Sequence, residues 1–148
     1  KIFSNNIILN KIKINLQIRD VYISNSKKNV LRGIHLNKGY KLVSCLSGKI
    51  IDVTIDLRKN SKTFLKIFKL QIDKESNKAI LIPPGVGHSF LSLENNTKVL
   101  YLSNRNYDQK YEKEINWNSI KFNWPCKQPK LSKKDLNAMS LKEYLKKN

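Results

Sequence analysis

The stretch Ile51-Asp52-Val53-Thr54-Ile55-Asp56-Leu57 places an apolar residue at every second position. Side chains of a β-strand alternate between its two faces, so this period of two predicts a strand with one apolar and one polar face. The segment Ile12–Ile18 repeats the pattern, with isoleucine and leucine against lysine, asparagine and glutamine. In each strand one face must point inward, and the other meets solvent or a lumen. Both segments therefore favour a β-structure with an interior.

Further segments rich in β-branched and aromatic residues predict more strands. They are Lys41–Leu46, Phe64–Ile72, Ala79–Ile82, Ser89–Leu93 and Val99–Ser103. Turn-forming residues such as Ser47-Gly48 and Pro83-Pro84-Gly85 separate them. Many short strands at this spacing predict a β-sandwich or barrel, since no helical pattern intervenes to make a parallel βαβ sheet. Helices are expected near the end, where Ser132 and Ser140 open capping signals, the second for a helix through Lys147.

Length and charge limit the classes of function. The 148 residues predict a single domain, 1–148, that is large enough to enclose a pocket. The net charge is +18, but the excess is mostly lysine scattered along the chain, outside any aromatic-bearing nucleic-acid motif. We therefore expect a solvated basic surface that favours an anionic small substrate, and no nucleic-acid partner. No apolar run reaches the ~18–20 residues that cross a bilayer, so no membrane partner is expected.

Two cysteines and two histidines restrict the chemistry further. Cys45 and Cys126 lie far apart without C-x-x-C spacing, which predicts two reduced thiols in a cytoplasmic protein, with a disulfide as the alternative. Two histidines without an H-x-H pair supply few of the nitrogen ligands that a transition-metal site needs, so we expect no metal. Nucleotide-binding glycine loops and a serine-hydrolase elbow are missing from the sequence.

Acid–base chemistry remains, and His35 is its first candidate. Histidine is the side chain whose proton moves near neutral pH, although a single histidine beside a strand is more often structural. Arg32, Lys41 and His88 favour the functional interpretation, because a barrel could gather them around an anionic or carbonyl ligand.

Several short motifs also follow one another in a specific order. They are Val30–His35, Lys41–Val43, Gly48–Arg58, Ser61–Phe64, Ile82–Phe90, Leu100-Tyr101, Ile115–Asn118, Asn123–Pro125 and Leu131–Asp135. Each is weak alone, whereas the ordered set is specific. Val30-Leu31-Arg32-Gly33-Ile34-His35 resembles the V-L-R-G-L-H segment of dTDP-4-dehydrorhamnose 3,5-epimerases, and Ile82–Phe90 resembles their I-P-x-G-F-A-H-G-F. The chain is accordingly identified as a member of that family.

The resemblance implies an all-β, cupin-type jelly-roll barrel with short C-terminal helices. It also implies a cytoplasmic homodimer that works without metal or organic cofactor. The family substrate is dTDP-4-dehydro-6-deoxy-D-glucose, which is inverted at C3 and C5, or at C3 only, in dTDP-L-rhamnose-type deoxysugar biosynthesis for products such as lipopolysaccharide. The alternatives are a related ketoisomerase acting on another activated sugar, and a non-catalytic sugar-binding cupin.

Catalytic roles follow from the resemblance residue by residue. His35 falls on the base, and Asp135 on the carboxylate that pairs with it. Tyr101 falls on the residue that protonates the opposite face, and Lys41 on the cation near the C4 carbonyl. The implied substrate contacts are Arg32, His88, Ser24 and Tyr107, the last near the nucleotide base. The structural alternatives are a surface position for Lys41, core packing for Tyr101, helix capping for Asp135 and a buried structural role for His88.

Three features depart from the family pattern. The family's D-x-R-G-x-F-x-E strand, which helps close the partner subunit's nucleotide site, has no counterpart, so we expect a fragment or a chain that lost this strand. Asp20-Val21-Tyr22 replaces Q-D-N, and an acid there would repel a pyrophosphate. The segment Leu36–Tyr40 is contracted, with Asn37 in place of glutamine, as in family members that act on GDP-linked 4-keto heptoses. These departures leave open which sugar and which nucleotide are bound.

Overall fold

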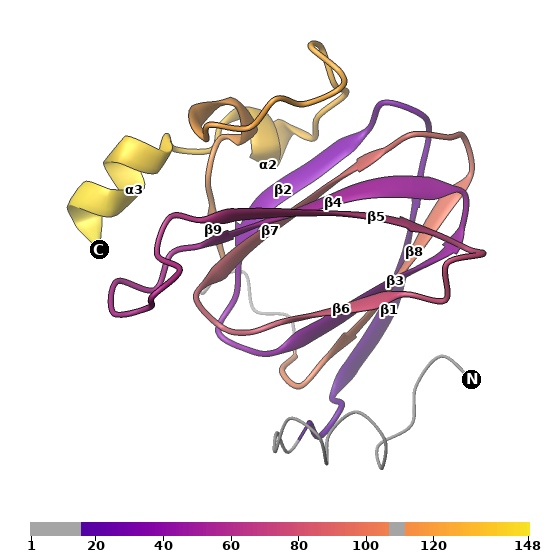
Figure 1. Ribbon diagram of the computed structural model, residues 1–148, viewed down its shortest axis with the longest axis horizontal. Coiled ribbons are helices and arrows are strands. Elements are labelled where there is room, and N and C mark those ends of the chain that lie inside the picture. Colours follow the sequence, from indigo (N-terminus) through magenta and orange to yellow (C-terminus); the bar gives the residue numbers. More distant parts are fainter. Residues whose placement is uncertain (1–15, 107–111) are drawn as a thin grey trace.

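The computed structural model describes residues 16–106 and 112–148, which form two antiparallel β-sheets that face each other (Figure 1). The first sheet has the order β1 (Asp20–Ser26), β8 (Thr97–Ser103), β3 (Lys41–Ser47), β6 (Ala79–Ile82). The second has the order β5 (Ile67–Asp73), β4 (Lys49–Asp56), β7 (Val86–Ser92), β2 (Leu31–Leu36), β9 (Lys113–Glu114). Along the chain the strands pass repeatedly between the two sheets, which is the jelly-roll connection pattern. The predicted all-β fold class is therefore confirmed.

The first strand does not lie where the alternation predicts it. Residues 12–15 lie outside the described residues, and residues 16–18 form no strand; β1 begins at Asp20. Its neighbour β8 ends at Ser103, which pairs with Asp20 and accepts a hydrogen bond from the Arg19 amide at 2.8 Å. Residues 16–18 therefore lie beyond the end of β8 and have no part of that strand to pair with. The strands β3 to β8 all lie within a few residues of their predicted positions.

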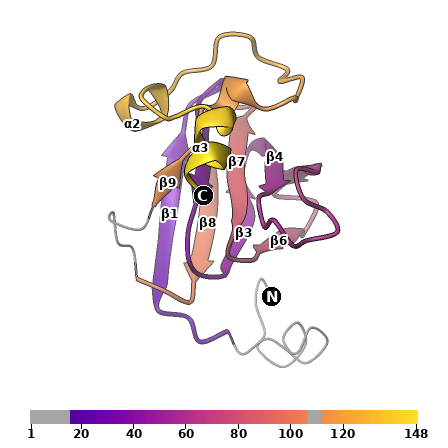
Figure 2. The same cartoon turned by 90° about the vertical axis from the view of Figure 1, so that its left-hand side faces the viewer.

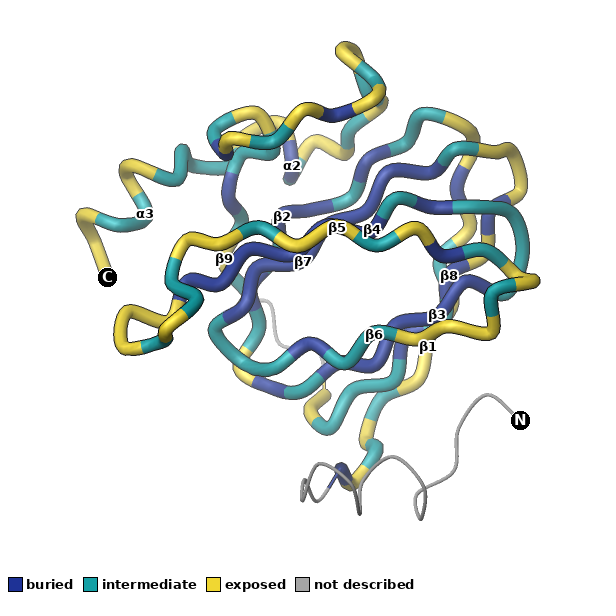
Figure 3. Tube along the Cα trace, in the orientation of Figure 1, coloured by how far each residue is buried: buried dark blue, intermediate teal, exposed yellow. Residues whose placement is uncertain are grey.

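The second sheet buries apolar side chains on both of its faces. The outer cluster includes Val53, Ile55 and Leu57, which are the apolar positions of the alternating stretch. The cluster between the sheets includes Ile50, Phe90 and other residues of both sheets. Figure 3 shows the buried residues concentrated in the inner strands, while β5 at the sheet edge is largely exposed. The polar face of β4 consequently points into the space between the sheets.

The C-terminal segment covers the outer face of the second sheet, near β2 and β9 (Figures 1 and 2). It contains the 3-10 helix η2 (Trp117–Ser119) and the helices α2 (Lys133–Leu136) and α3 (Leu141–Lys147). As predicted, Ser132 and Ser140 are the N-cap residues of α2 and α3. The edge-to-face pair Trp117 and Trp124, with ring centroids 6.2 Å apart, packs against the outer cluster. This packing attaches the C-terminal segment to the second sheet.

The two cysteines, Cys45 and Cys126, are free thiols, in agreement with the sequence. Within residues 16–106 and 112–148, none of the helices is both long and apolar enough to cross a membrane.

Candidate active site

His35 on β2 is hydrogen-bonded to Asp135 on α2, with 2.6 Å between Nε2 and Oδ1. Asp135 is buried, and the cap residue Ser132 donates to its Oδ2 at 2.7 Å while accepting from its backbone amide at 3.1 Å. Burial alone would raise the pKa of Asp135, but the hydrogen bond and charge of His35, with Ser132, hold that pKa below its ordinary value. The carboxylate is thus kept ionised and aimed at one ring nitrogen of His35, as a base and its orienting partner require.

The local conformation of β2 brings the two histidines together. Gly33 has a φ of +115°, and a Cβ atom there would lie 2.5 Å from the carbonyl oxygen of His88. Only glycine tolerates this approach of β2 to β7 without displacing a strand. Beyond the resulting irregularity in register, His35 pairs directly with His88. The glycine of the Arg-Gly-Ile-His motif is therefore required by the close packing of β2 on β7.

His88 is oriented by a residue that the sequence analysis did not single out. Its Nε2 lies 2.7 Å from Oδ2 of Asp52 on β4, and both residues are buried. The other oxygen, Oδ1, has no hydrogen-bond partner among the described residues. The sequence does contain an indication that Asp52 is a site residue: it is a carboxylate on the polar face of the alternating strand Ile51–Leu57. Its partner could not be read from the sequence, because His88 lies 36 residues away.

Tyr101 lies in the space between the sheets and is enclosed by three groups. Its ring stacks on Tyr22, with centroids 4.5 Å apart and planes inclined by 12°. His88 meets it edge-on at 6.5 Å, and Lys41 Nζ lies 5.7 Å from the ring centroid. Burial raises the pKa of the Tyr101 hydroxyl, with Tyr22 and Asp52 adding to the rise and Ser24 opposing it. The phenol is therefore held protonated at neutral pH, ready to act as a proton donor.

Lys41, the first residue of β3, is buried although its side chain is charged. Burial lowers the pKa of its ammonium, whereas the carboxylates of Glu112 and Asp20 oppose that shift. An ammonium in such a site interacts strongly with negative charge that develops nearby, because little water screens it. Lys41 is thus suited to stabilise an oxyanion.

A pocket of about 420 Å³ brings these residues together. It is lined by Asp20, Tyr22, Ser24, Arg32, His35, Lys41, His88, Phe90, Tyr101, Glu112, Ser132, Lys134 and Asp135. Every sequence-predicted site residue that the structure describes is therefore in one pocket. Tyr107 lies outside the described residues, and its role stays a prediction. The alternative of a surface position for Lys41 is wrong, because the residue is buried in this pocket.

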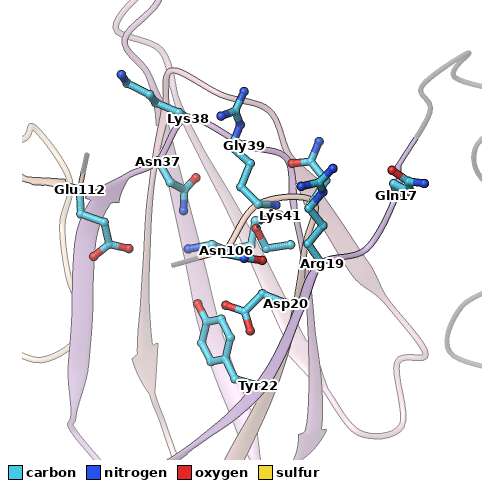
Figure 4. A pocket seen from close by; sticks show the side chains of 13 residues that line it. Gln17, Arg19, Asp20, Tyr22, Asn37, Lys38, Gly39, Lys41, Asn106 and Glu112 are labelled. Atoms are coloured by element: carbon cyan, nitrogen blue, oxygen red, sulfur yellow. Dashed lines mark hydrogen bonds between the residues drawn. The ribbon is translucent and has the colours of Figure 1, made fainter. Parts of the chain in front are cut away.

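A second pocket of about 650 Å³ adjoins the first and shares Asp20, Tyr22, Lys41 and Glu112 with it. Figure 4 shows Asp20 and Tyr22 projecting side by side from β1 into this space, with Asn37 and Lys38 of the contracted segment at its rim. The neighbouring residues Arg19 and Arg105 add positive charge. The combined volume is sufficient for a ligand larger than one sugar ring.

Two further observations concern cations in the site. Among residues 16–106 and 112–148, no group of three or more His, Cys, Asp or Glu side chains is placed to hold a metal ion. Lys134 Nζ lies 2.8 Å from Glu112 and 2.6 Å from Glu114, which ties α2 to β9 beside the pocket that Lys134 and Glu112 line. The arrangement offers a base, a proton donor and an ammonium around one cavity, which suits proton transfer at carbon beside a carbonyl group.

Comparisons with known proteins agree with this chemistry. The family model for dTDP-4-dehydrorhamnose 3,5-epimerase matches residues 1–143. The dTDP-4-dehydrorhamnose 3,5-epimerase of Salmonella typhimurium is 39% identical over 129 residues, covering 82% of this chain and 70% of the relative.

Two solved structures are similar over almost the whole chain. A 3,5-epimerase from Legionella pneumophila in complex with dTDP-4-keto-L-rhamnose is 29% identical, with a TM-score of 0.89 over 95% of this chain and 78% of that chain. ChmJ, a 3'-monoepimerase from Streptomyces bikiniensis in complex with dTDP-quinovose, is 28% identical, with a TM-score of 0.91 over 99% of this chain and 78% of that chain. The pocket, the fold and these similarities lead to one conclusion: the chain belongs to the dTDP-4-dehydrorhamnose 3,5-epimerase family of isomerases.

Proposed function

We propose that residues 1–148 act as one catalytic unit, a cofactor-independent epimerase of a nucleotide-linked 4-keto-6-deoxy sugar. The observation that carries the proposal is the convergence of the hydrogen-bonded pair His35–Asp135 with Tyr101 and Lys41 on a single pocket. A non-catalytic sugar-binding cupin would have no need of a buried ammonium beside a buried phenol. The retention of all four groups therefore favours catalysis.

The reaction begins with removal of a proton from carbon. The hydrogens at C3 and C5 are acidic because both carbons adjoin the C4 ketone, and neutral His35 accepts one of them. Asp135, 2.6 Å from Nε2, stabilises the imidazolium that forms. The electrons of the broken C–H bond move into an enolate, whose oxygen is negative. Lys41 stabilises that oxygen, and a single preorganised donor of this kind contributes about 3–4 kcal/mol.

Inversion is completed from the opposite face of the sugar ring. Tyr101 donates its hydroxyl proton to the carbon, the ketone re-forms, and the tyrosinate left behind regains a proton from solvent. His35 releases its proton to solvent in turn, so the protein returns to its starting state and no electrons are exchanged with a cofactor. The raised pKa of Tyr101 fits a group that must be protonated before each turnover.

The substrate proposal rests on charge and on the ligands of the related structures. Arg32, held by Ser26 at 3.2 Å, lines the pocket and can meet a phosphate of the substrate. Lys134 and Ser132 lie beside the same cavity. The structures from Legionella pneumophila and Streptomyces bikiniensis contain dTDP-linked sugars. We therefore propose dTDP-4-keto-6-deoxy-D-glucose or a close analogue, in a deoxysugar pathway of the dTDP-L-rhamnose type that supplies lipopolysaccharide.

We also propose a cytoplasmic homodimer. Two free cysteines fit a reducing compartment. The edge strand β1 exposes Val21 and Ile23, and its outer side pairs with no other described strand. Exposed apolar residues on an unpaired edge are typical of a surface that another chain covers.

The test is proton exchange. The protein is incubated in D₂O with dTDP-4-keto-6-deoxy-D-glucose, and deuterium at C3 and C5 is measured by NMR. We expect label at one or both carbons, and its loss in His35→Ala with unchanged circular dichroism. Phe68→Ala, a substitution on an exposed side chain of β5, is the control and keeps the wild-type rate. Exchange at neither carbon would contradict the proposed reaction for this substrate, and exchange that survives His35→Ala would remove His35 from its role.

A further inference from the structure

Tyr22 occupies one face of the proposed proton donor. It lies directly opposite Tyr101 in the antiparallel register of β1 and β8, and the two rings stack at 4.5 Å. Alternation along β1 turns Tyr22 toward the pocket together with Asp20 and Ser24, and Val21 toward the other face. Tyr22 is 40% exposed through the open side of the pocket. Figure 4 shows the Tyr22 ring beside Asp20 in the adjoining larger pocket, which Tyr22 also lines. Tyr22 is the last residue of Asp20-Val21-Tyr22, which replaces the family's Q-D-N. A large aromatic ring therefore takes the place of a small asparagine side chain.

The stack determines how freely Tyr101 can move. His88, on the facing sheet, meets Tyr101 edge-on at 6.5 Å, and Lys41 on the neighbouring strand β3 has its Nζ 5.7 Å from the ring centroid. On the β1 side Tyr22 is the covering group, and β1 is the edge strand of its sheet. Parallel offset rings at this distance attract each other, so the contact holds the plane of the Tyr101 phenol. Without Tyr22, the Tyr101 ring would gain room toward the sheet edge.

The position of the phenol bears on which carbon is inverted. C3 and C5 lie on opposite sides of C4, so one base and one donor reach both carbons only if the sugar turns or repuckers between two steps. If Tyr22 holds the plane of the Tyr101 phenol and narrows the pocket, one of the two orientations of the sugar is favoured over the other. The family includes both kinds of outcome, since similarity extends to 3,5-epimerases and to a 3'-monoepimerase.

We propose that Tyr22 is a positioning and specificity-determining residue that stacks on Tyr101 and makes one α-carbon of the 4-keto sugar exchange faster than the other. This inference rests on the proposed epimerase function. Tyr22 does not itself transfer a proton; it acts through the orientation of Tyr101 and through the width of the pocket.

The first test measures the ratio of deuterium at the two carbons. Wild type, Tyr22→Phe and Tyr22→Asn are compared with dTDP-4-keto-6-deoxy-D-glucose in D₂O at early times. We expect wild type and Tyr22→Phe, which keeps the stacked ring, to favour one carbon by about tenfold, equivalent to about 1.4 kcal/mol in activation free energy. Tyr22→Asn should bring the two rates to within about threefold of each other. Equal rates in wild type, or the same ratio in Tyr22→Asn as in wild type, would overturn the inference.

The second test needs no substrate, so it separates failure of the inference from failure of the proposed function. Tyrosine is labelled with ¹³C in the ring, and the Tyr101 signals are assigned with Tyr101→Phe. We expect one well-defined set of Tyr101 signals in wild type and Tyr22→Phe, and broadened or multiple sets in Tyr22→Asn, because the ring samples more orientations. Equally sharp single signals in Tyr22→Asn would show that Tyr22 does not position Tyr101. Absence of exchange in wild type, by contrast, would count against the epimerase function.

Discussion

The hydrogen bond between His35 and Asp135 can be tested at the level of one atom. Asp135→Asn keeps the shape of the side chain but removes the charge that stabilises an imidazolium 2.6 Å away. We expect kcat to fall by about 10²–10⁴-fold while the fold is retained. The measurement is the exchange rate in D₂O, together with circular dichroism.

The control for this substitution is Ser132→Ala. It removes the hydroxyl that caps α2 and contacts Asp135 Oδ2, yet leaves the carboxylate beside His35. The cost to stability is about 1 kcal/mol, typical of an N-cap, and kcat should stay within about tenfold of wild type. Equal losses in the two variants would mean that Asp135 acts as a helix cap rather than as the partner of His35.

Lys41 predicts an alkaline limit on activity. Burial lowers the pKa of its ammonium below the ordinary lysine value, whereas burial raises the pKa of Tyr101. As the pH rises, Lys41 therefore loses its proton before Tyr101 does, and with it the charge that stabilises the enolate. We expect kcat to decline at a pH below 10.5, the ordinary lysine value. In Lys41→Arg the residual activity should persist to higher pH, because a guanidinium stays protonated there. An identical alkaline limb in both proteins would assign it to another group.

The site residues could be predicted from the sequence to different degrees. His35 and Asp135 were placed by motif, but their contact depends on a helix that meets β2 one hundred positions away along the chain. Asp52 and Tyr22 were not recognised as site residues, because the register of β4 with β7 and of β1 with β8 decides what they face. Strand register over long sequence separations is set by the whole fold, so no local pattern reports it.

At the scale of elements, a carboxylate holds the connection from β4 to β5. Buried Asp56 accepts hydrogen bonds from Arg58 at 2.9 and 2.7 Å, from Ser61 at 2.7 Å and from Thr63 at 2.6 Å. The side chain of Arg58 foremost, then Ser61 and Thr63, holds the pKa of Asp56 far below its ordinary value. The turn therefore depends on the ionised form of one aspartate.

We expect Asp56→Asn to lower the free energy of unfolding at pH 7 by about 2–3 kcal/mol, since several hydrogen bonds to a buried charge are weakened. The folded-state pKa is depressed, so this stabilisation is complete above the unfolded-state pKa of about 3.9 and is lost as the pH falls toward the folded-state value. The difference between wild type and variant should therefore narrow by about 1 kcal/mol at pH 3. Urea unfolding of wild type and Asp56→Asn at pH 7 and at pH 3 measures this difference in the free energy of unfolding.

Asp73→Asn is the matched control for this prediction. Asp73 ends β5 and accepts a single hydrogen bond from the Ser76 amide at 2.8 Å, which an asparagine side chain can also accept. We expect a change of about 0.5 kcal/mol or less at pH 7. A gap between wild type and Asp56→Asn that is the same at pH 3 and pH 7 would contradict the role of the ionised carboxylate.

Elements were predicted well where a strand has one apolar face, and less well where it does not. The strand β4 shows the alternation clearly, because Val53, Ile55 and Leu57 pack under the C-terminal segment. In β1 the usual distribution is reversed, since Asp20 and Tyr22 face the pocket and Ile23 is 56% exposed. A strand that lines a polar pocket and exposes its apolar residues does not resemble a half-buried strand, and its pattern alone did not predict it.

At the scale of the whole molecule, the exposed apolar side of β1 predicts a homodimer. Val21 and Ile23 are both 56% exposed on an edge strand, and a second copy would remove them from water. Ile23→Lys places a charge in that interface, so we expect the dimer to dissociate to monomers, as measured by sedimentation equilibrium. Phe68→Lys is the matched control, because Phe68 is 53% exposed on β5 at the edge of the other sheet and should leave the dimer intact. A monomeric wild type would exclude the dimer. Dissociation by Phe68→Lys but not by Ile23→Lys would place the interface elsewhere. Because β1 also carries Tyr22, a dimer formed through this strand would hold one wall of the pocket in place, and Ile23→Lys should then lower the exchange rate along with the oligomeric state.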